Sequence, residues 1–194
     1  GVDLELFKPL NEKRDKPFVI GTVKALEHVY GIDRLIEVFA SFNKRYPDAE
    51  CHIYGAGSEL KKLEILANNL GVSNNIKFFG VIPQDQVPRA IASMDVFCVL
   101  SREESFGVAA VEAAACKVPV IASNVGGLPE VVSNNETGYL VDGDNSEQIK
   151  EVIIDLYNNP EKRRELGEKG RVLVEQQYDW KRNVLQMEKY YTQK

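Results

Sequence analysis

The chain has 194 residues, of which 44% are hydrophobic and 27% are charged, so we expect one sizeable core and a single domain over residues 1–194. Its formal net charge of -5 at pH 7 disfavours a nucleic-acid-binding surface. The sequence has no apolar stretch of about 18 residues and no signal-peptide pattern at its start. We therefore expect a soluble, cytoplasmic protein that has no nucleic-acid partner.

Strand-like and helix-like segments alternate along the chain, which is typical of βαβ units that form a parallel sheet. Six segments have the apolar composition of strands, namely residues 18–23, 50–54, 76–79, 96–100, 119–122 and 138–141. Most lack a two-residue alternation, as expected for strands covered by helices on both faces. The predicted fold class is α/β, a Rossmann-like three-layer α/β/α domain with a roughly six-stranded parallel sheet.

Apolar residues recur at helical spacing between these strands. The first helical stripe covers residues 32–42, and its expected solvent face carries Asp33 and Arg34. The next helix follows Ser58, a predicted N-cap, and residues 83–94 predict a shorter helix. Two further predicted helices cover residues 149–156 and 160–177.

The two ends of the chain have different patterns. Residues 1–16 have the character of a linker and do not begin with methionine, which favours a piece of a longer protein. Residues 179–194 predict a terminal helix, with Trp180, Val184, Met187 and Tyr191 on one apolar edge. We expect this edge to pack on its own domain. The alternative is that part of it contacts another domain or subunit.

Two sets of residues argue against redox and metal chemistry. The cysteines Cys51, Cys98 and Cys116 form no close pair, and we expect buried thiols in a reducing compartment. His52 lies inside a predicted strand, where a structural role is expected, and His28 lies in a loop. Because no cluster has metal-ligand spacing, the sequence implies neither a metal nor a cofactor.

The most informative segment covers residues 101–113, where a buried strand is predicted to turn into an alanine-rich helix. Phe106 and Gly107 interrupt the apolar pattern, which resumes at Val108. Such a turn directs unpaired N–H groups and the positive end of the helix dipole at one place. This segment therefore predicts a phosphate site.

Glu104 and Glu112 lie on either side of that turn, and both would repel a phosphate. An ionised carboxylate can instead accept hydrogen bonds from a vicinal diol, which a sugar nucleotide supplies on its ribose and its hexose. Two glutamates at this spacing are common as solvated surface acids. The strand, glycine and helix around them favour a site for a sugar nucleotide.

Several motifs, taken together, resemble one family. They are Gly1-Val2-Asp3, Phe7-Lys8-Pro9, Gly55-Ala56-Gly57, Phe79-Gly80, the segment from Glu104 to Glu112, Pro119-Val120 and Gly126-Gly127-Leu128-Pro129-Glu130. Over essentially its whole length, the chain resembles the C-terminal half of a family-4 retaining glycosyltransferase of the GT-B fold. The resemblance implies a domain that binds a nucleotide-sugar donor and faces an N-terminal acceptor domain, which this chain lacks.

The resemblance also assigns roles to residues around the turn. Glu112 would accept hydrogen bonds from the ribose, and Glu104 would hold a hydroxyl of the transferred hexose. The N–H groups of Phe106, Gly107 and Val108 would meet the diphosphate or the sugar. Further candidates are Gly126 and Gly127 for the sugar or phosphate, Val81 and Ile82 for the base, and Gly55 and Gly57 for either the nucleotide or a tight turn.

The cations of the site depart from the family pattern. Where the family has an arginine and a lysine, this sequence has Thr22 and Tyr30, so Lys24 is the nearest cation and the predicted diphosphate ligand. Either Arg102 or a residue of the absent domain could compensate for the missing arginine. A second departure is Lys117, where the family often has glycine.

The sequence therefore predicts the donor-binding domain of a glycosyltransferase that moves a hexose from a UDP- or GDP-sugar, with Glu104 and Lys24 as catalytic residues. Glycan, polysaccharide or glycolipid synthesis is the expected setting, with peripheral membrane association possible through the other half. This half alone is expected to bind nucleotide without catalysing transfer. The alternatives are a sugar-nucleotide epimerase of the same fold and a non-catalytic nucleotide-binding module.

Overall fold

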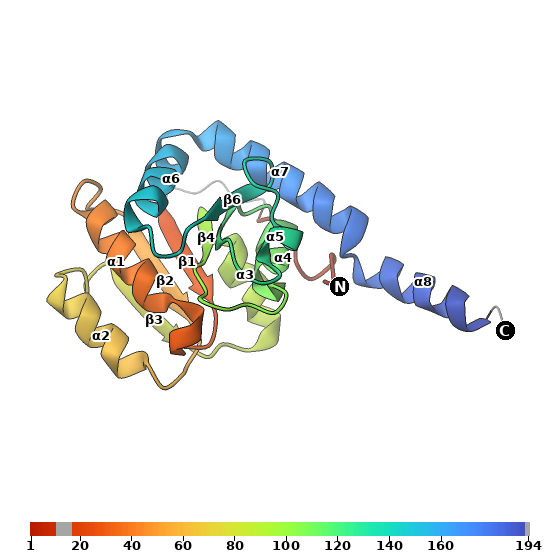
Figure 1. The fold of residues 1–194 in the computed structure, drawn as a ribbon, viewed down its shortest axis with the longest axis horizontal. Coiled ribbons are helices and arrows are strands. Elements are labelled where there is room, and N and C mark those ends of the chain that lie inside the picture. The colour runs from red at the N-terminus through yellow and green to blue at the C-terminus, as the bar shows by residue number, and fades with distance from the viewer. Residues whose placement is uncertain (11–16, 193–194) are drawn as a thin grey trace.

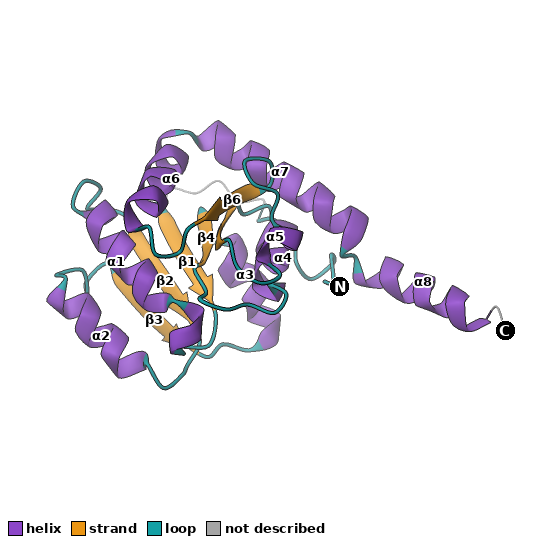
Figure 2. Cartoon of the chain, in the orientation of Figure 1, coloured by secondary structure: helices purple, strands orange, loops and turns teal. Residues whose placement is uncertain are grey.

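The computed structural model describes residues 1–10 and 17–192. At its centre is a parallel sheet with the strand order β3-β2-β1-β4-β5-β6 (Figure 2). The strands are β1 (Val19–Val23), β2 (Glu50–Tyr54), β3 (Ile76–Gly80), β4 (Val96–Val99), β5 (Val120–Ser123) and β6 (Gly138–Val141). All six predicted strands are confirmed, and so is the Rossmann-like class.

Helices cover both faces of the sheet, as the apolar strands require (Figure 1). The first face carries α1 (Ile32–Asn43), α2 (Leu60–Asn69) and α6 (Ser146–Asn158). The second carries α3 (Val87–Ala92), α4 (Val108–Ala115) and α5 (Leu128–Val131), with α7 (Pro160–Gln177) packed on α4. The predicted three layers are therefore confirmed.

The core is formed by two apolar clusters, one on each face of the sheet. On the first face, Ile36 and Phe39 of α1 are fully buried. On the second face, Ile91 of α3 and Val111 of α4 are buried beside the sheet. Each such side chain stabilises the fold by about 1.5–3 kcal/mol through burial. This packing holds the loops between strands and helices at fixed positions along the edge of the sheet.

Two helix predictions were wrong in detail. Ser58 is not the N-cap of α2, because that position belongs to Glu59 and no side chain caps the helix. The backbone N–H and the hydroxyl of Ser58 instead donate hydrogen bonds to Glu27, at 2.9 and 2.5 Å. The helix predicted over residues 83–94 is divided into a short 3-10 helix η2 (Gln84–Gln86) and α3.

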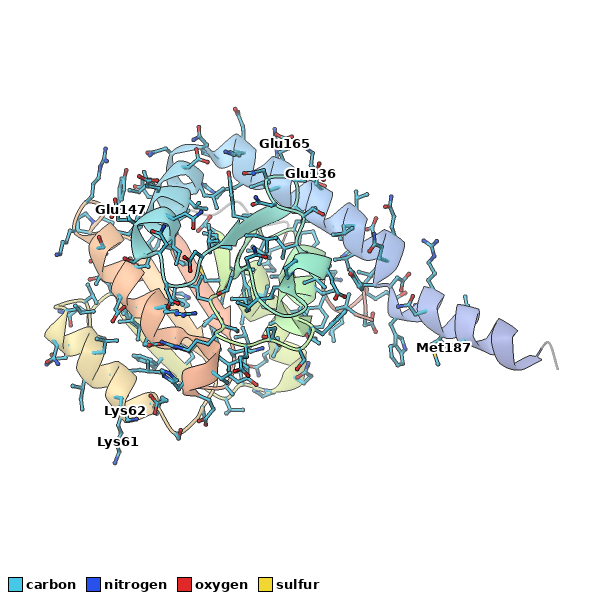
Figure 3. All side chains as sticks on the ribbon, viewed as in Figure 1. Lys61, Lys62, Glu136, Glu147, Glu165 and Met187 are labelled. Atoms are coloured by element: carbon cyan, nitrogen blue, oxygen red, sulfur yellow. The ribbon has the colours of Figure 1, made fainter. Side chains whose placement is uncertain are left out.

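The terminal helix α8 (Trp180–Thr192) projects away from the body of the molecule (Figure 1). Trp180 and Met187 are 56% and 57% exposed, and Met187 lies on the projecting part (Figure 3). The expectation that this edge packs on its own domain was therefore wrong for these side chains. Val184 is half-buried, and the side chain of Tyr191 lies outside the described residues.

The N-terminal segment lies beside the start of α8. The N–H of Val2 donates to the carbonyl of Tyr178 at 2.7 Å, and the N–H of Trp180 donates to the carbonyl of Val2 at 3.0 Å. Val2 and Phe7 are buried, so residues 1–10 lie against the body. The rest of the predicted linker, residues 11–16, lies outside the described residues.

The prediction of buried thiols is confirmed, since all three cysteines are free and buried. Burial raises the pKa of Cys98 to about 12, which keeps this thiol protonated. No helix within the described ranges is long and apolar enough to cross a membrane.

Candidate functional site

The candidate site lies where the direction of the strand order changes. β1 and β4 are neighbours in the sheet, with Ile20 opposite Val96. The chain leaves β1 toward α1 on one face and leaves β4 toward α4 on the other. In open parallel sheets this arrangement opens a crevice at the carboxyl ends of the two strands, where ligands bind.

The start of α4 confirms the predicted strand-loop-helix turn. Gly107 precedes the helix with a φ of 94°, in the left-handed region that favours glycine. A Cβ atom on Gly107 would lie 2.8 Å from a side-chain carbon of Leu128. The structure gives the N–H groups of Phe106, Gly107 and Val108 no acceptor in the described part of the chain. These donors are available to an anion at the positive end of the helix.

Lys24 and Glu104 meet in this crevice. The Lys24 Nζ lies 2.6 Å from Oε2 of Glu104, and the two side chains are 16% and 10% exposed. The same ammonium lies 4.3 Å from the centre of the Tyr30 ring, in a cation–π contact. Ser101 donates a hydrogen bond to Glu104 at 3.4 Å. The structure thus places the predicted cation beside the predicted sugar-binding carboxylate.

Glu112 lies inside α4, about one turn from its start, as predicted. Its carboxyl group is partly buried and has no hydrogen-bond partner in the described ranges. Burial raises the pKa of Glu112 to about 7, and the positive charge of Lys24 opposes that rise. An unpaired carboxyl group beside free helix N–H groups can accept hydrogen bonds from a polyhydroxylated ligand.

Gly126 and Gly127 are brought against the loop that carries Glu104. Gly126 has a φ of 52°, and a Cβ atom there would lie 1.8 Å from the carbonyl oxygen of Glu104. The N–H of Gly127 donates to that same oxygen at 3.1 Å. These glycines therefore fix the backbone of Glu104. The N–H of Gly127 is therefore already engaged within the protein, and contact of the Gly126 N–H with a ligand stays a prediction.

Gly55 and Gly57 perform a similar task beside β1. A Cβ atom on Gly55 would lie 1.9 Å from the carbonyl oxygen of Lys24, and one on Gly57 would lie 2.3 Å from that of Leu26. The close approach of two loops explains both glycines without a ligand. Their contact with a nucleotide stays a prediction.

The structure does not place every candidate in one cavity. A cavity of 390 Å³ is lined by Tyr30, Glu104 and Gly126, among others. Ile82 instead lines a separate cavity of 610 Å³ beside the rings of Tyr54 and Phe79. Val81, the neighbour of Ile82, is 76% exposed.

The side chains at the start of α1 correct one expectation. Asp33 and Arg34 were expected to face solvent, and this was wrong for Arg34, whose side chain is 12% exposed, whereas Asp33 is partly exposed and paired. Arg102 donates to both carboxylate oxygens of Asp33, at 2.9 and 2.6 Å. Arg34 donates to the carbonyl oxygen of Leu100 at 3.2 Å. The guanidinium of Arg102 is therefore engaged by Asp33, which weakens the suggestion that it replaces the missing arginine.

The surroundings of three residues account for their identities. Two of them, Tyr30 and Lys117, depart from the family pattern, and the third, His52, was expected to have a structural role. Tyr30 stands where the family has a lysine and lies against Lys24. Lys117 has a φ of 60°, which explains why a glycine suits this position in the family. His52 lies on β2 and contacts Glu50 at 2.7 Å, in the structural role expected for it. In the described ranges, no group of three His, Cys, Asp or Glu residues could hold a metal ion.

Comparisons with known proteins agree with this geometry. The family described as "Glycosyl transferases group 1" matches residues 4–173. One relative is a GDP-mannose-dependent alpha-(1-6)-phosphatidylinositol monomannoside mannosyltransferase of Mycolicibacterium smegmatis. It is 32% identical to this chain over an alignment of 198 residues, and the alignment covers 93% of this chain and 52% of that protein. The chain thus spans about half the length of this relative.

Two solved structures have the same fold. The C-terminal domain of a glycosyl transferase group 1 family protein from Francisella tularensis is 29% identical with a TM-score of 0.85, covering 93% of this chain and 100% of that domain. Sucrose-phosphate synthase from Thermosynechococcus elongatus is 29% identical with a TM-score of 0.90, covering 100% of this chain and 51% of the synthase. The chain therefore belongs to the glycosyl transferases group 1 family and has the fold of the C-terminal domain of a GT-B enzyme.

Proposed function

We propose that this chain binds the nucleoside-diphosphate-sugar donor of a retaining glycosyltransferase and, joined to an acceptor-binding half, transfers a hexose. The observation that carries the proposal is that three groups lie around the start of α4 and the adjoining end of β1. These groups are the free N–H groups at the start of α4, the Lys24–Glu104 pair, and the unpaired carboxyl group of Glu112. They match a diphosphate, a hexose and a ribose respectively.

Each group has a chemical task in this proposal. As the glycosidic bond breaks, negative charge grows on the diphosphate, and Lys24 with the N–H groups of Phe106, Gly107 and Val108 stabilises that charge. Glu104 accepts a hydrogen bond from the hexose and thereby orients it. Glu112 accepts hydrogen bonds from the ribose hydroxyls. Lys24 exchanges part of its ion pair with Glu104 for the diphosphate when the donor binds.

The donor is a UDP- or GDP-sugar in this proposal. The Mycolicibacterium smegmatis relative is named for its dependence on GDP-mannose, which supports a nucleoside-diphosphate hexose as the class. Because the chain spans only half of that protein, the acceptor and any membrane association belong to the part outside this sequence. Glycan, polysaccharide or glycolipid synthesis remains the proposed setting.

Titration of the chain with UDP, GDP and ADP tests the proposal, with backbone amide shifts as the measurement. We expect at least one nucleotide to shift the amides of Phe106 to Glu112. Replacing Glu112 with Gln should weaken that binding at pH 8 by about 1–3 kcal/mol, because hydrogen bonds to a charged group are lost. If none of the nucleotides perturbs this segment, the donor-site proposal is wrong.

A further inference from the structure

One side chain joins the two loops that line the crevice. The first loop contains the 3-10 helix η1 (His28–Tyr30), and the second follows β4 and carries Glu104. Arg102 in the second loop donates a hydrogen bond to the carbonyl of His28 at 2.7 Å. The backbone N–H of Arg102 donates to the carbonyl of Val29, also at 2.7 Å. Side chain and backbone of one residue thus hold the loops together.

Asp33 completes this connection from the first turn of α1. Its two carboxylate oxygens accept the paired hydrogen bonds of the Arg102 guanidinium. A bidentate pair restricts orientation as well as distance, since both N–H donors must lie in the plane of the carboxylate. Negative charge at a helix N-terminus is also favourable, so α1 supports Asp33 in this position.

The Arg102–Asp33 pair lies close to the segments that carry Lys24 and Glu104. Tyr30, at the end of the first loop, contacts the ammonium of Lys24, and Glu104 lies two residues after Arg102. The pair therefore lies between the residue that supports Lys24 and the backbone of Glu104. Arg102 and Tyr30 both line the 390 Å³ cavity that contains Glu104.

We propose that Arg102 and Asp33 are positioning residues, which hold Glu104 and Lys24 at the separation that the donor sugar and diphosphate require. This inference rests on the proposed function, and it assigns neither residue a direct contact with the donor. The planar guanidinium group is essential to this positioning role. A lysine at position 102 cannot donate two hydrogen bonds to the carboxylate of Asp33 and still reach the carbonyl of His28.

Isothermal titration of the chain with UDP, GDP, UDP-glucose and GDP-mannose tests this inference. The variants are Arg102→Gln, Asp33→Asn and the combination of both. We expect each single change to weaken binding of the nucleotide sugar about tenfold and binding of the nucleoside diphosphate less, because the sugar depends on Glu104. The combined variant should bind no more weakly than either single variant, as expected for two residues acting as one unit.

A matched control is available on α2. Lys62 forms an ion pair with Glu59 at 2.6 Å, and its side chain is 75% exposed at the surface of that helix. Lys62→Gln should leave every affinity unchanged. Arg102→Lys keeps the positive charge but loses the planar set of N–H donors, so it should weaken binding as much as Arg102→Gln does. Thermal unfolding of each variant shows whether it is folded.

Other results would overturn the inference. If Arg102→Gln weakens all ligands and Asp33→Asn weakens none, Arg102 is a direct diphosphate ligand. If both variants lose thermal stability but keep the wild-type ratio of sugar to diphosphate affinity, the pair is only structural. If the unchanged chain binds none of the four ligands, the proposed function itself fails, which the wild-type titration alone reveals.

Discussion

Glu104 and Glu112 lie on opposite sides of the start of α4, and their surroundings differ. Glu104 is paired with Lys24 at 2.6 Å and is held by a loop whose backbone is fixed by two glycines. Glu112 is part of a regular helix, is partly buried and has no described hydrogen-bond partner. One carboxylate is therefore paired within the protein before any ligand binds, whereas the other has no protein partner among the described residues.

The largest effect is expected from the loop that supports Glu104. Gly126→Ala places a Cβ atom against the carbonyl oxygen of Glu104 and strains a positive φ, so we expect a loss of about 3 kcal/mol in the free energy of unfolding. Urea denaturation measures this loss. The control is Gly71→Ala, since Gly71 also has a positive φ, 73°, but a Cβ atom there meets nothing within 4 Å. Equal losses in both variants would show that strain alone matters.

A smaller effect of the opposite sign is expected at Glu112. Burial raises the pKa of Glu112 from 4.5 to about 7, so between these values the folded chain holds a proton that the unfolded chain has released. The contribution of this group to stability is therefore present below pH 4.5 and is lost as the pH rises through 7. Glu112→Gln removes that loss, and we expect it to stabilise the chain at pH 8 by about 1–3 kcal/mol.

The same substitution separates stability from binding. Urea denaturation at pH 4.5 and pH 8 should show the stabilisation by Glu112→Gln only at the higher pH. A variant that is more stable but binds nucleotide more weakly would show that the carboxyl group of Glu112 contributes to nucleotide binding and lowers the stability of the folded chain. Identical pH dependence in both proteins would mean that Glu112 does not titrate in this range.

The smallest effect is expected at the cation that both carboxylates share. Lys24→Met leaves Glu104 without its ion pair, at a cost of about 1–2 kcal/mol because the site is only partly closed to water. It should also raise the pKa of Glu112, since the charge of Lys24 lowers it. Carboxyl-carbon NMR titration measures that pKa. The control is Glu103→Gln, an exposed neighbour of Glu104, which should change stability by less than about 0.5 kcal/mol.

Much of the fold could be predicted because its signals are local. Strands covered on both faces are continuous apolar runs, and the six runs of this sequence became the six strands. Ser58 failed as an N-cap because Glu27, 31 residues away in the sequence, takes both of its hydrogen bonds. The periodic pattern of α1 likewise could not show that Asp33 faces a distant arginine. The misses thus involve long-range partners of polar residues.

The candidate site could be predicted from the sequence to about the same extent as the fold. The turn at Gly107 and the positions of both glutamates follow from residue types along one segment. The cation–π contact between Tyr30 and Lys24 was missed because no sequence pattern indicates that an aromatic ring will lie beside a particular lysine. A positive φ at Lys117 could be inferred only indirectly, from the glycine that the family often has there.

The Lys24–Glu104 contact also bears on how this chain folds. Its two members are 80 residues apart in the sequence, and they meet only when β1 and β4 are neighbours. Forming such a distant contact requires closure of a long loop, whose entropy must be offset by packing of the intervening β2, β3 and their helices. A partly folded chain with native helices but an unpaired β4 would lack the crevice. Nucleotide binding during refolding would therefore report assembly of the central strands and not the formation of secondary structure.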